Sequence, residues 1–98
     1  MQRVVHPAAE GEVVEAFRWY LERSEETDQR FLDEPDSAFA STERTPLQAR
    51  QHLAGTRRVL LPSFPYMVVY RVMSDRLWVL AVAHGRRRPG YWKSRLHD

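Results

Sequence analysis

The sequence predicts an α+β fold in which two N-terminal helices pack on one face of a small, mainly antiparallel sheet. Apolar residues recur at helical spacing in the first half of the chain. The second half instead holds three short runs rich in valine, leucine and aromatic residues, which are typical of strands. A strand, two helices and a three-strand meander in this order indicate an α+β domain. Because a chain of 98 residues can close only one hydrophobic core, we expect residues 1–98 to form a single domain.

The chain is expected to begin with an edge strand and an amphipathic helix. Gln2–Val5 is a short strand-like run, and Pro7 suits the first turn of a helix, where its missing N–H costs nothing. The helix is expected over residues 8–23, with its acidic residues mainly at solvent-facing positions. Its apolar residues recur at helical spacing: Val13, Phe17, Tyr20 and Leu21.

A second helix and a connector are expected to follow. The polar residues 24–28 predict a break, and a second helix is expected from Phe31 to about Ser41. Pro35 lies inside that helix, so a kink or an interruption is expected there. Residues 42–55 have no strong periodicity and are interpreted as a connector with a short helical turn at residues 47–53.

Three strands are expected in the second half, at Arg57–Leu61, Tyr66–Met73 and Leu77–Ala83. The short break at Ser74 and Asp75 predicts a hairpin between the last two. Strict alternation in the last strand predicts two apolar rows, which indicates a central strand covered on both faces. One predicted row is Leu77, Val79, Ala81 and Ala83, and the other is Trp78, Leu80, Val82 and His84.

Several classes of function are disfavoured by composition. The longest apolar run, residues 67–83, is interrupted by charged residues, so no membrane partner is expected. The absence of cysteine removes disulfides, thiolate metal sites and cysteine nucleophiles. The N-terminus lacks the apolar block of a signal peptide, which favours a cytoplasmic location. No phosphate-binding glycine loop is present and the four histidines are scattered, so neither a cofactor nor a metal is expected.

Charge is divided unequally between the two halves of the chain. Residues 1–55 contain 6 Lys and Arg against 11 Asp and Glu, a balance of −5, whereas residues 56–98 contain 9 against 2, a balance of +7. The C-terminal half is therefore the expected surface for a polyanion or an acidic protein partner.

The basic half also contains the residues expected to contact a target. Arg57 and Arg58 open one predicted strand, Arg71 lies in the next, and the segment 84–92 (HGRRRPGYW) follows the last. Guanidinium groups bind phosphate in a bidentate fork, and aromatic rings stack on unpaired bases. The candidate set is Arg57, Arg58, Arg71, Arg86, Arg87, Tyr91 and Trp92. Trp92 has a second interpretation, as a ring that folds back to complete the limited core of a small domain.

The run from Arg57 to Arg95, with its Phe-Pro-Tyr motif at residues 64–66 and its His-to-Trp motif at residues 84–92, resembles the C-terminal half of the RelE/ParE superfamily of type II toxins. The first predicted helix is also similar to the first helix of that family. The resemblance implies a RelE/ParE-like, microbial-RNase-like fold. It further implies a toxin that arrests growth when free and is neutralised by a cognate antitoxin.

Three functions remain open within this resemblance. ParE-like members inhibit DNA gyrase, whereas RelE-like members cleave mRNA on the ribosome without a metal. The resemblance places Met67 where RelE-like nucleases have a phosphate-binding arginine, which favours the ParE-like branch. For a nuclease, the resemblance together with the residue types assigns catalytic roles to His84, Arg86 and Tyr91. The third alternative is an RNA-binding remnant without toxicity.

Overall fold

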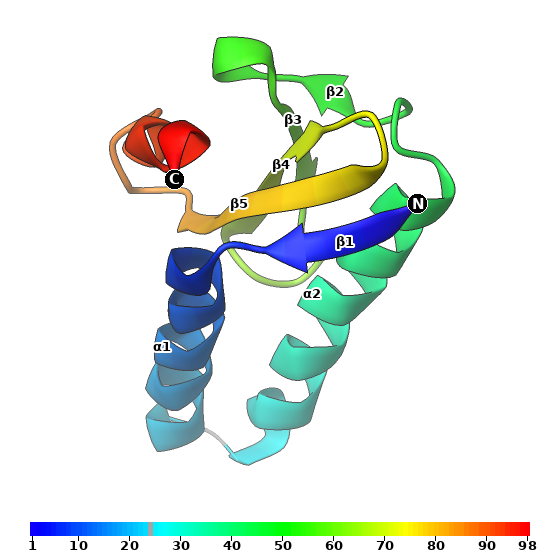
Figure 1. Cartoon of the computed structure of the whole chain (residues 1–98). Helices are drawn as coiled ribbons and strands as arrows, with labels where there is room; N and C mark the ends of the chain where they lie inside the picture. The colour runs from blue at the N-terminus through cyan, green and yellow to red at the C-terminus, as the bar shows by residue number, and fades with distance from the viewer. Residues whose placement is uncertain (24) are drawn as a thin grey trace.

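Two helices, α1 (Pro7–Arg23) and α2 (Glu25–Arg44), lie against one face of a sheet (Figure 1). The structure is a computed structural model that describes the backbone at residues 1–23 and 25–98 and the side chains at residues 1–23 and 31–98. The sheet has the order β1 (Gln2–Val5), β5 (Arg76–His84), β4 (Tyr66–Val72), β3 (Arg57–Leu60) and β2 (Arg50–Gln51). Strand β1 is parallel to β5, and the other neighbouring strands are antiparallel. The predicted fold class is confirmed.

The N-terminal edge strand and the first helix are confirmed, but the second helix is longer than expected. Helix α2 begins at Glu25 and ends at Arg44. The predicted polar break is therefore wrong for residues 25–28, while Ser24 lies outside the described residues. Polarity alone is a poor sign of a break, because glutamate, which occupies positions 25 and 26, has good helix propensity.

Helix α2 continues through Pro35, so the predicted interruption is wrong. Proline cannot donate the backbone hydrogen bond that would reach the carbonyl of Phe31. Phe31, Pro35 and Ala38 are all buried, and their spacing places them on one stripe of the helix. Burial of this stripe against the sheet stabilises the helix enough to offset the missing bond.

The connector after α2 contains a short strand in place of the predicted helical turn. Strand β2 has only two residues, which pair with β3, and a 3₁₀ helix, η1 (Leu53–Gly55), follows it. A guanidinium nitrogen of Arg57 fixes the connector by donating to the carbonyls of Leu47 and Ala49 at 3.0 and 2.8 Å. Two residues are too few to produce a periodic pattern in the sequence.

The meander of β3, β4 and β5 and the hairpin after β4 are confirmed, but a bulge in β5 changes the predicted rows. Val69 pairs with Ala81 and Tyr70 pairs with Val79, so Leu80 is an extra residue. Beyond the bulge the alternation is inverted. Val82 therefore joins the core beneath the helices, whereas Ala81 and Ala83 face the opposite side of the sheet.

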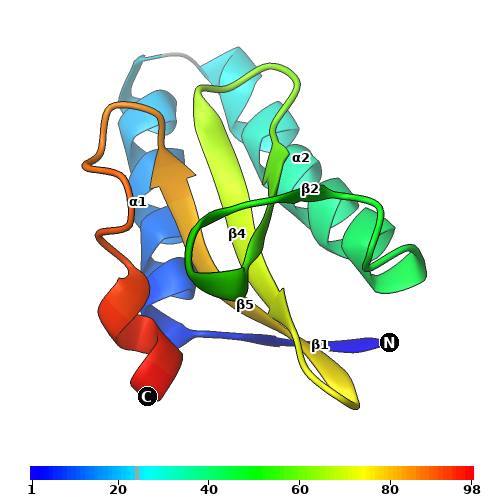
Figure 2. The same cartoon turned by 90° about the horizontal axis from the view of Figure 1, so that it is seen from above.

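The C-terminal segment, which ends in the 3₁₀ helix η2 (Lys93–His97), covers part of the face of the sheet opposite the helices (Figure 1). Trp92 is buried there with Val69, Leu80, Ala81 and Ala83. The chain returns to the sheet through a turn with proline at its second position and Gly90, at φ +76°, at its third, the pattern of a type II turn. Figure 2 shows the loop after β5 and the C-terminal segment lying on the same side of the molecule as α1.

Candidate functional site

A cleft of about 410 Å³ opens between α1 and the end of β5. It brings together two carboxylates, an imidazole, a guanidinium and several aromatic rings. Its lining residues are Glu12, Glu15, Ala16, Trp19, Tyr20, Tyr66, Val82, His84, Arg87 and Tyr91. The bulge in β5 is needed for this arrangement, because strict alternation would have placed His84 on the other face of the sheet.

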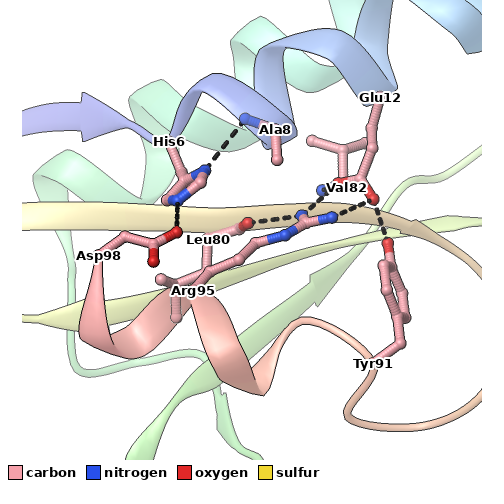
Figure 3. Close-up of polar contacts among 8 residues, drawn as sticks. All are labelled: His6, Ala8, Glu12, Leu80, Val82, Tyr91, Arg95 and Asp98. Carbon is pink, nitrogen blue, oxygen red and sulfur yellow. Dashed lines mark hydrogen bonds and ion pairs between the residues drawn. The ribbon is translucent and has the colours of Figure 1, made fainter.

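Glu12 on α1 is the centre of the polar contacts at one end of the cleft (Figure 3). Its two carboxylate oxygens accept bonds from the Arg95 guanidinium at 2.9 and 3.1 Å, a bidentate ion pair. The Tyr91 hydroxyl also donates to Glu12. The Glu12 and Arg95 side chains are only 12% and 15% exposed. The expectation that the acidic residues of α1 face solvent is thus wrong for Glu12.

Glu12 and Arg95 also bind backbone groups of β5 beyond the point where β1 ends. Strand β1 pairs with β5 only as far as Val79, so the next backbone groups of β5 have no strand beside them. The N–H of Val82 instead donates to Glu12 at 3.0 Å, and Arg95 donates to the carbonyl of Leu80 at 2.9 Å. Two side chains therefore satisfy backbone groups that would otherwise lose hydrogen bonds on burial.

A second contact holds the last residue of the chain against the start of α1. The backbone N–H of Ala8 donates to Nδ1 of His6 at 3.0 Å, so the ring proton lies on Nε2. That Nε2 is 2.6 Å from the Asp98 carboxylate, to which it donates (Figure 3). His6 thus caps α1 with one nitrogen and binds the C-terminal residue with the other.

Tyr91 is held as a protonated phenol. Burial raises the pKa of Tyr91 well above its usual value, and the hydrogen bond to Glu12 and the negative charge of Glu12 raise it further. The Arg87 guanidinium stacks on the Tyr91 ring, 3.9 Å from its centroid. A phenol that donates to a carboxylate cannot accept a proton from a substrate at neutral pH, so Tyr91 is unsuited to act as a general base.

The structure brings two of the three proposed nuclease residues into one cleft. His84 and Tyr91 both line it, together with Arg87, whereas Arg86 is exposed and does not. Nδ1 of His84 accepts the backbone N–H of Arg86 at 3.0 Å, so the ring proton of a neutral His84 lies on Nε2. Within the described residues, no group of three His, Cys, Asp or Glu side chains could hold a metal.

The predicted basic residues do not all lie in one region. Arg57 pairs with Tyr70, on the helix side of the sheet, and its guanidinium serves the connector. Arg58 and Arg71 lie on the other face, where they pair with Val69 and Trp78. The loop that carries Arg86–Arg88 follows His84, at the opposite end of β4 and β5 from Arg71. Arg71 lies five positions along β4 from Tyr66, which pairs with His84, a distance of roughly 17 Å.

Trp92 is 1% exposed, so its second interpretation, as a core residue, describes the structure. The assignment of Trp92 to target binding is therefore corrected, since its ring has no accessible face on which a base could stack. Met67, on the same face of the sheet, packs against this cluster.

His52 lies beside Trp92 and close enough to Arg58 for the charge of Arg58 to affect its pKa. Its ring centroid is 5.9 Å from that of Trp92. Burial lowers the pKa of His52, and the positive charge of Arg58 lowers it further. The folded state therefore binds a proton at His52 less tightly than the unfolded chain does. The contribution of His52 to the free energy of unfolding is fully present above the unfolded pKa of about 6.5. It is lost as the pH falls from there through the folded pKa.

We expect the Arg58→Ala variant to raise the pKa of His52 toward its ordinary value, because the second cause of the shift is removed while burial remains. The measurement is an NMR titration of the His52 ring in both proteins. Arg88→Ala, which removes an exposed charge in the loop after β5, is the control and should leave the His52 titration unchanged. Equal titration of His52 in the parent and in Arg58→Ala would contradict the assigned cause.

Comparison with known proteins supports the fold and assigns the family. A search of curated proteins gives no significant match. The structure is similar to a solved structure described as "Chromosomal ParDE TA system from P. aeruginosa", with a TM-score of 0.72 and 13% sequence identity. That similarity covers 86% of this chain and 95% of the other, and shows a shared fold.

The sequence itself matches a family model over residues 4–89, described as the ParE toxin of the parDE type II toxin–antitoxin system. The matched residues include both helices and the meander, and end just before Tyr91 and Trp92. A toxin of a parDE system has a cognate ParD antitoxin as its partner. The chain therefore belongs to the ParE toxin family of type II toxin–antitoxin systems.

Proposed function

We propose that this toxin arrests growth by inhibiting DNA gyrase without cutting RNA. The observation that carries the proposal is the ParE family match over residues 4–89, because gyrase inhibition is typical of ParE toxins. The contacts of Tyr91 give further support. Its hydroxyl is bound to Glu12 and its pKa is raised, so it is a poor candidate for the proton transfers that RNA cleavage requires.

The antitoxin is expected to present an acidic, amphipathic segment to the basic half of the toxin. Residues 56–98 have a net charge of +7, and complementary charge favours both the rate and the specificity of association. The antitoxin then neutralises the toxin because it covers the residues with which the free toxin contacts its target.

The test is expression of residues 1–98 in bacteria, followed by identification of the process that fails first. Growth should stop, and co-expression of the product of the adjacent small gene should restore it. Purified toxin should inhibit supercoiling by purified gyrase, while translated messages in the arrested cells stay intact. Cleavages mapped within translated messages would instead identify a ribosome-dependent nuclease. Normal growth with confirmed soluble toxin would favour the RNA-binding remnant.

We expect the Arg86→Ala variant to lose most of its toxicity while its melting temperature stays nearly constant. Arg86 is exposed, so its removal leaves the core intact and should change stability by less than about 0.5 kcal/mol. A charge-assisted contact to a phosphate or carboxylate of the target is worth about 1.5–3 kcal/mol, or roughly ten- to a hundredfold in affinity. The measurement is a titration of toxicity against inducer, beside a melting curve of the purified protein.

Arg88→Ala is the matched control for this prediction. It removes the same charge from the same loop, next to Pro89 in the turn, and should have only a mild effect on toxicity. An Arg86→Ala toxin as potent as the parent would remove Arg86 from the target-binding surface.

A further inference from the structure

Three arginines form a row across the face of the sheet that lies opposite the helices. Arg50 on β2 pairs directly with Arg58 on β3, and Arg58 pairs with Val69 on β4. Val69 belongs to the cluster around Trp92, which fixes the face on which these side chains lie. Arg71 follows Val69 by two residues in β4 and therefore lies on the same face, diagonal to Arg58.

The spacing brings the three positive charges close together. Directly opposed residues of an antiparallel pair have Cβ atoms about 5 Å apart, and diagonal neighbours lie about 7–8 Å apart. Like charges in directly opposed positions are destabilising. The row, defined as Arg50, Arg58 and Arg71, therefore brings positive charges together although this arrangement does not stabilise the fold.

The row has no carboxylate beside it among the residues whose side chains are described. The ion pairs found in that part of the chain involve Arg3, His6, Arg23, Arg76 and Arg95, and none includes a member of the row. Arg50 and Arg71 are exposed and Arg58 is half-buried. The lowered pKa of His52, caused by burial and then by the charge of Arg58, agrees with a positive potential at this place.

The direction of the row distinguishes between classes of polyanion. It crosses β2, β3 and β4, with Arg50 directly opposite Arg58 and with Arg71 offset by two residues along β4. An acidic peptide that paired with the edge of the sheet would run along β2 and would meet only Arg50 from this row. A phosphodiester backbone needs no pairing with the sheet, so it can cross the strands and place successive phosphates on successive guanidinium groups.

From this arrangement we propose that the row Arg50, Arg58 and Arg71 is a binding site for the phosphodiester backbone of a nucleic acid. Contacts from guanidinium groups to phosphate position a nucleic acid without reading its sequence. The site is therefore expected to bind without sequence preference and with a strong dependence on salt.

The test measures binding of the full chain to labelled nucleic acid by fluorescence anisotropy, without gyrase or ribosomes. The probes are a duplex DNA of about 20 base pairs and a single-stranded RNA of similar length, each titrated between about 50 and 200 mM salt. The slope of log K against log salt should become shallower by about 2 in Arg50→Ala/Arg58→Ala and by about 1 in Arg71→Ala. The probe that shows these changes identifies DNA or RNA as the natural source of the phosphates.

Arg18→Ala/Arg44→Ala is the matched control, since it removes the same number of positive charges, here from the two helices. It should leave the slope close to that of the parent. Melting curves check that each variant folds, and Arg50→Gln/Arg58→Gln, which keeps longer polar side chains, replaces the alanine variant if that one does not fold.

Two results would overturn the proposal. One is a slope that falls equally in the row variant and in the control, which would indicate net charge as the only cause. The other is binding of poly-glutamate through the same arginines while neither nucleic acid depends on them, which would identify an acidic peptide as the ligand. Because these assays contain no gyrase and no cells, their failure leaves the growth-arrest experiment, and the proposed function that it tests, unaffected.

Discussion

Replacing Trp92 with alanine is expected to lower the free energy of unfolding by about 3–5 kcal/mol. The ring is 1% exposed and covers Val69, Leu80 and Ala81 on a face of the sheet that the helices do not reach. Its removal leaves a cavity and also loses the contacts that fix the C-terminal segment. A domain of this size has a total stability of about 5–15 kcal/mol, so much of it is lost.

The measurement is a pair of denaturation curves, by heat and by urea, for the parent and Trp92→Ala. Each kcal/mol corresponds to about 4–8 °C in a domain of this size, so the melting temperature should fall by tens of degrees. Trp19→Ala is the control, because it removes the same side chain from a position on α1 that is 49% exposed. A Trp92→Ala protein as stable as Trp19→Ala would contradict the core role of Trp92 and return its ring to the surface.

The sequence predicts most of the sheet because burial imposes a pattern on each strand. Three of the strands are rich in valine, leucine and aromatic residues, and the break at Ser74 and Asp75 is the turn that joins the last two. The central position of β5 follows from apolar residues on both of its faces, a pattern that only a covered strand requires. These features arise from residues that are neighbours along the chain, so they can be recognised in a single sequence.

The bulge at Leu80 could not be predicted in this way. One extra residue in β5 inverts the alternation that follows it, and strict period-two reasoning then places Val82 and His84 on the wrong face. The bulge occurs where β1 ends and side chains replace a neighbouring strand. The bulge thus coincides with contacts between distant parts of the chain, which a local sequence pattern does not contain.

The lining of the cleft can be predicted only in part, for a similar reason. Residue type identifies His84, Arg87 and Tyr91, which lie together in the cleft, but the helical pattern places Glu12 among the solvent-facing residues. One signal was present in the sequence. Glu12 lies three residues after Ala9 and four before Ala16, and both alanines are buried, so its spacing places it on the buried stripe of α1. Its partner Arg95 is 83 residues away, and no spacing rule connects them.

Replacing Glu12 with alanine is expected to destabilise the fold by about 3–5 kcal/mol, because one partner of a buried ion pair is left without the other. Arg95 would keep its charge at a position that is 15% exposed. The Tyr91 hydroxyl and the Val82 N–H would lose their acceptor in the same step. Glu15→Ala provides the control, since Glu15 lines the same cleft one turn further along α1 and is exposed.

Two measurements separate the loss of this contact from a general loss of structure. A double-mutant cycle with Arg95→Ala should give a double variant that is less destabilised than the sum of the two single variants, because the uncompensated charge has gone. An NMR titration of the Tyr91 ring should show a lower pKa for Tyr91 in Glu12→Ala than in the parent, since the hydrogen bond and the negative charge that raise it are removed while burial remains. Additive energies together with an unchanged Tyr91 titration would mean that Glu12 does not join α1, β5 and the C-terminal segment.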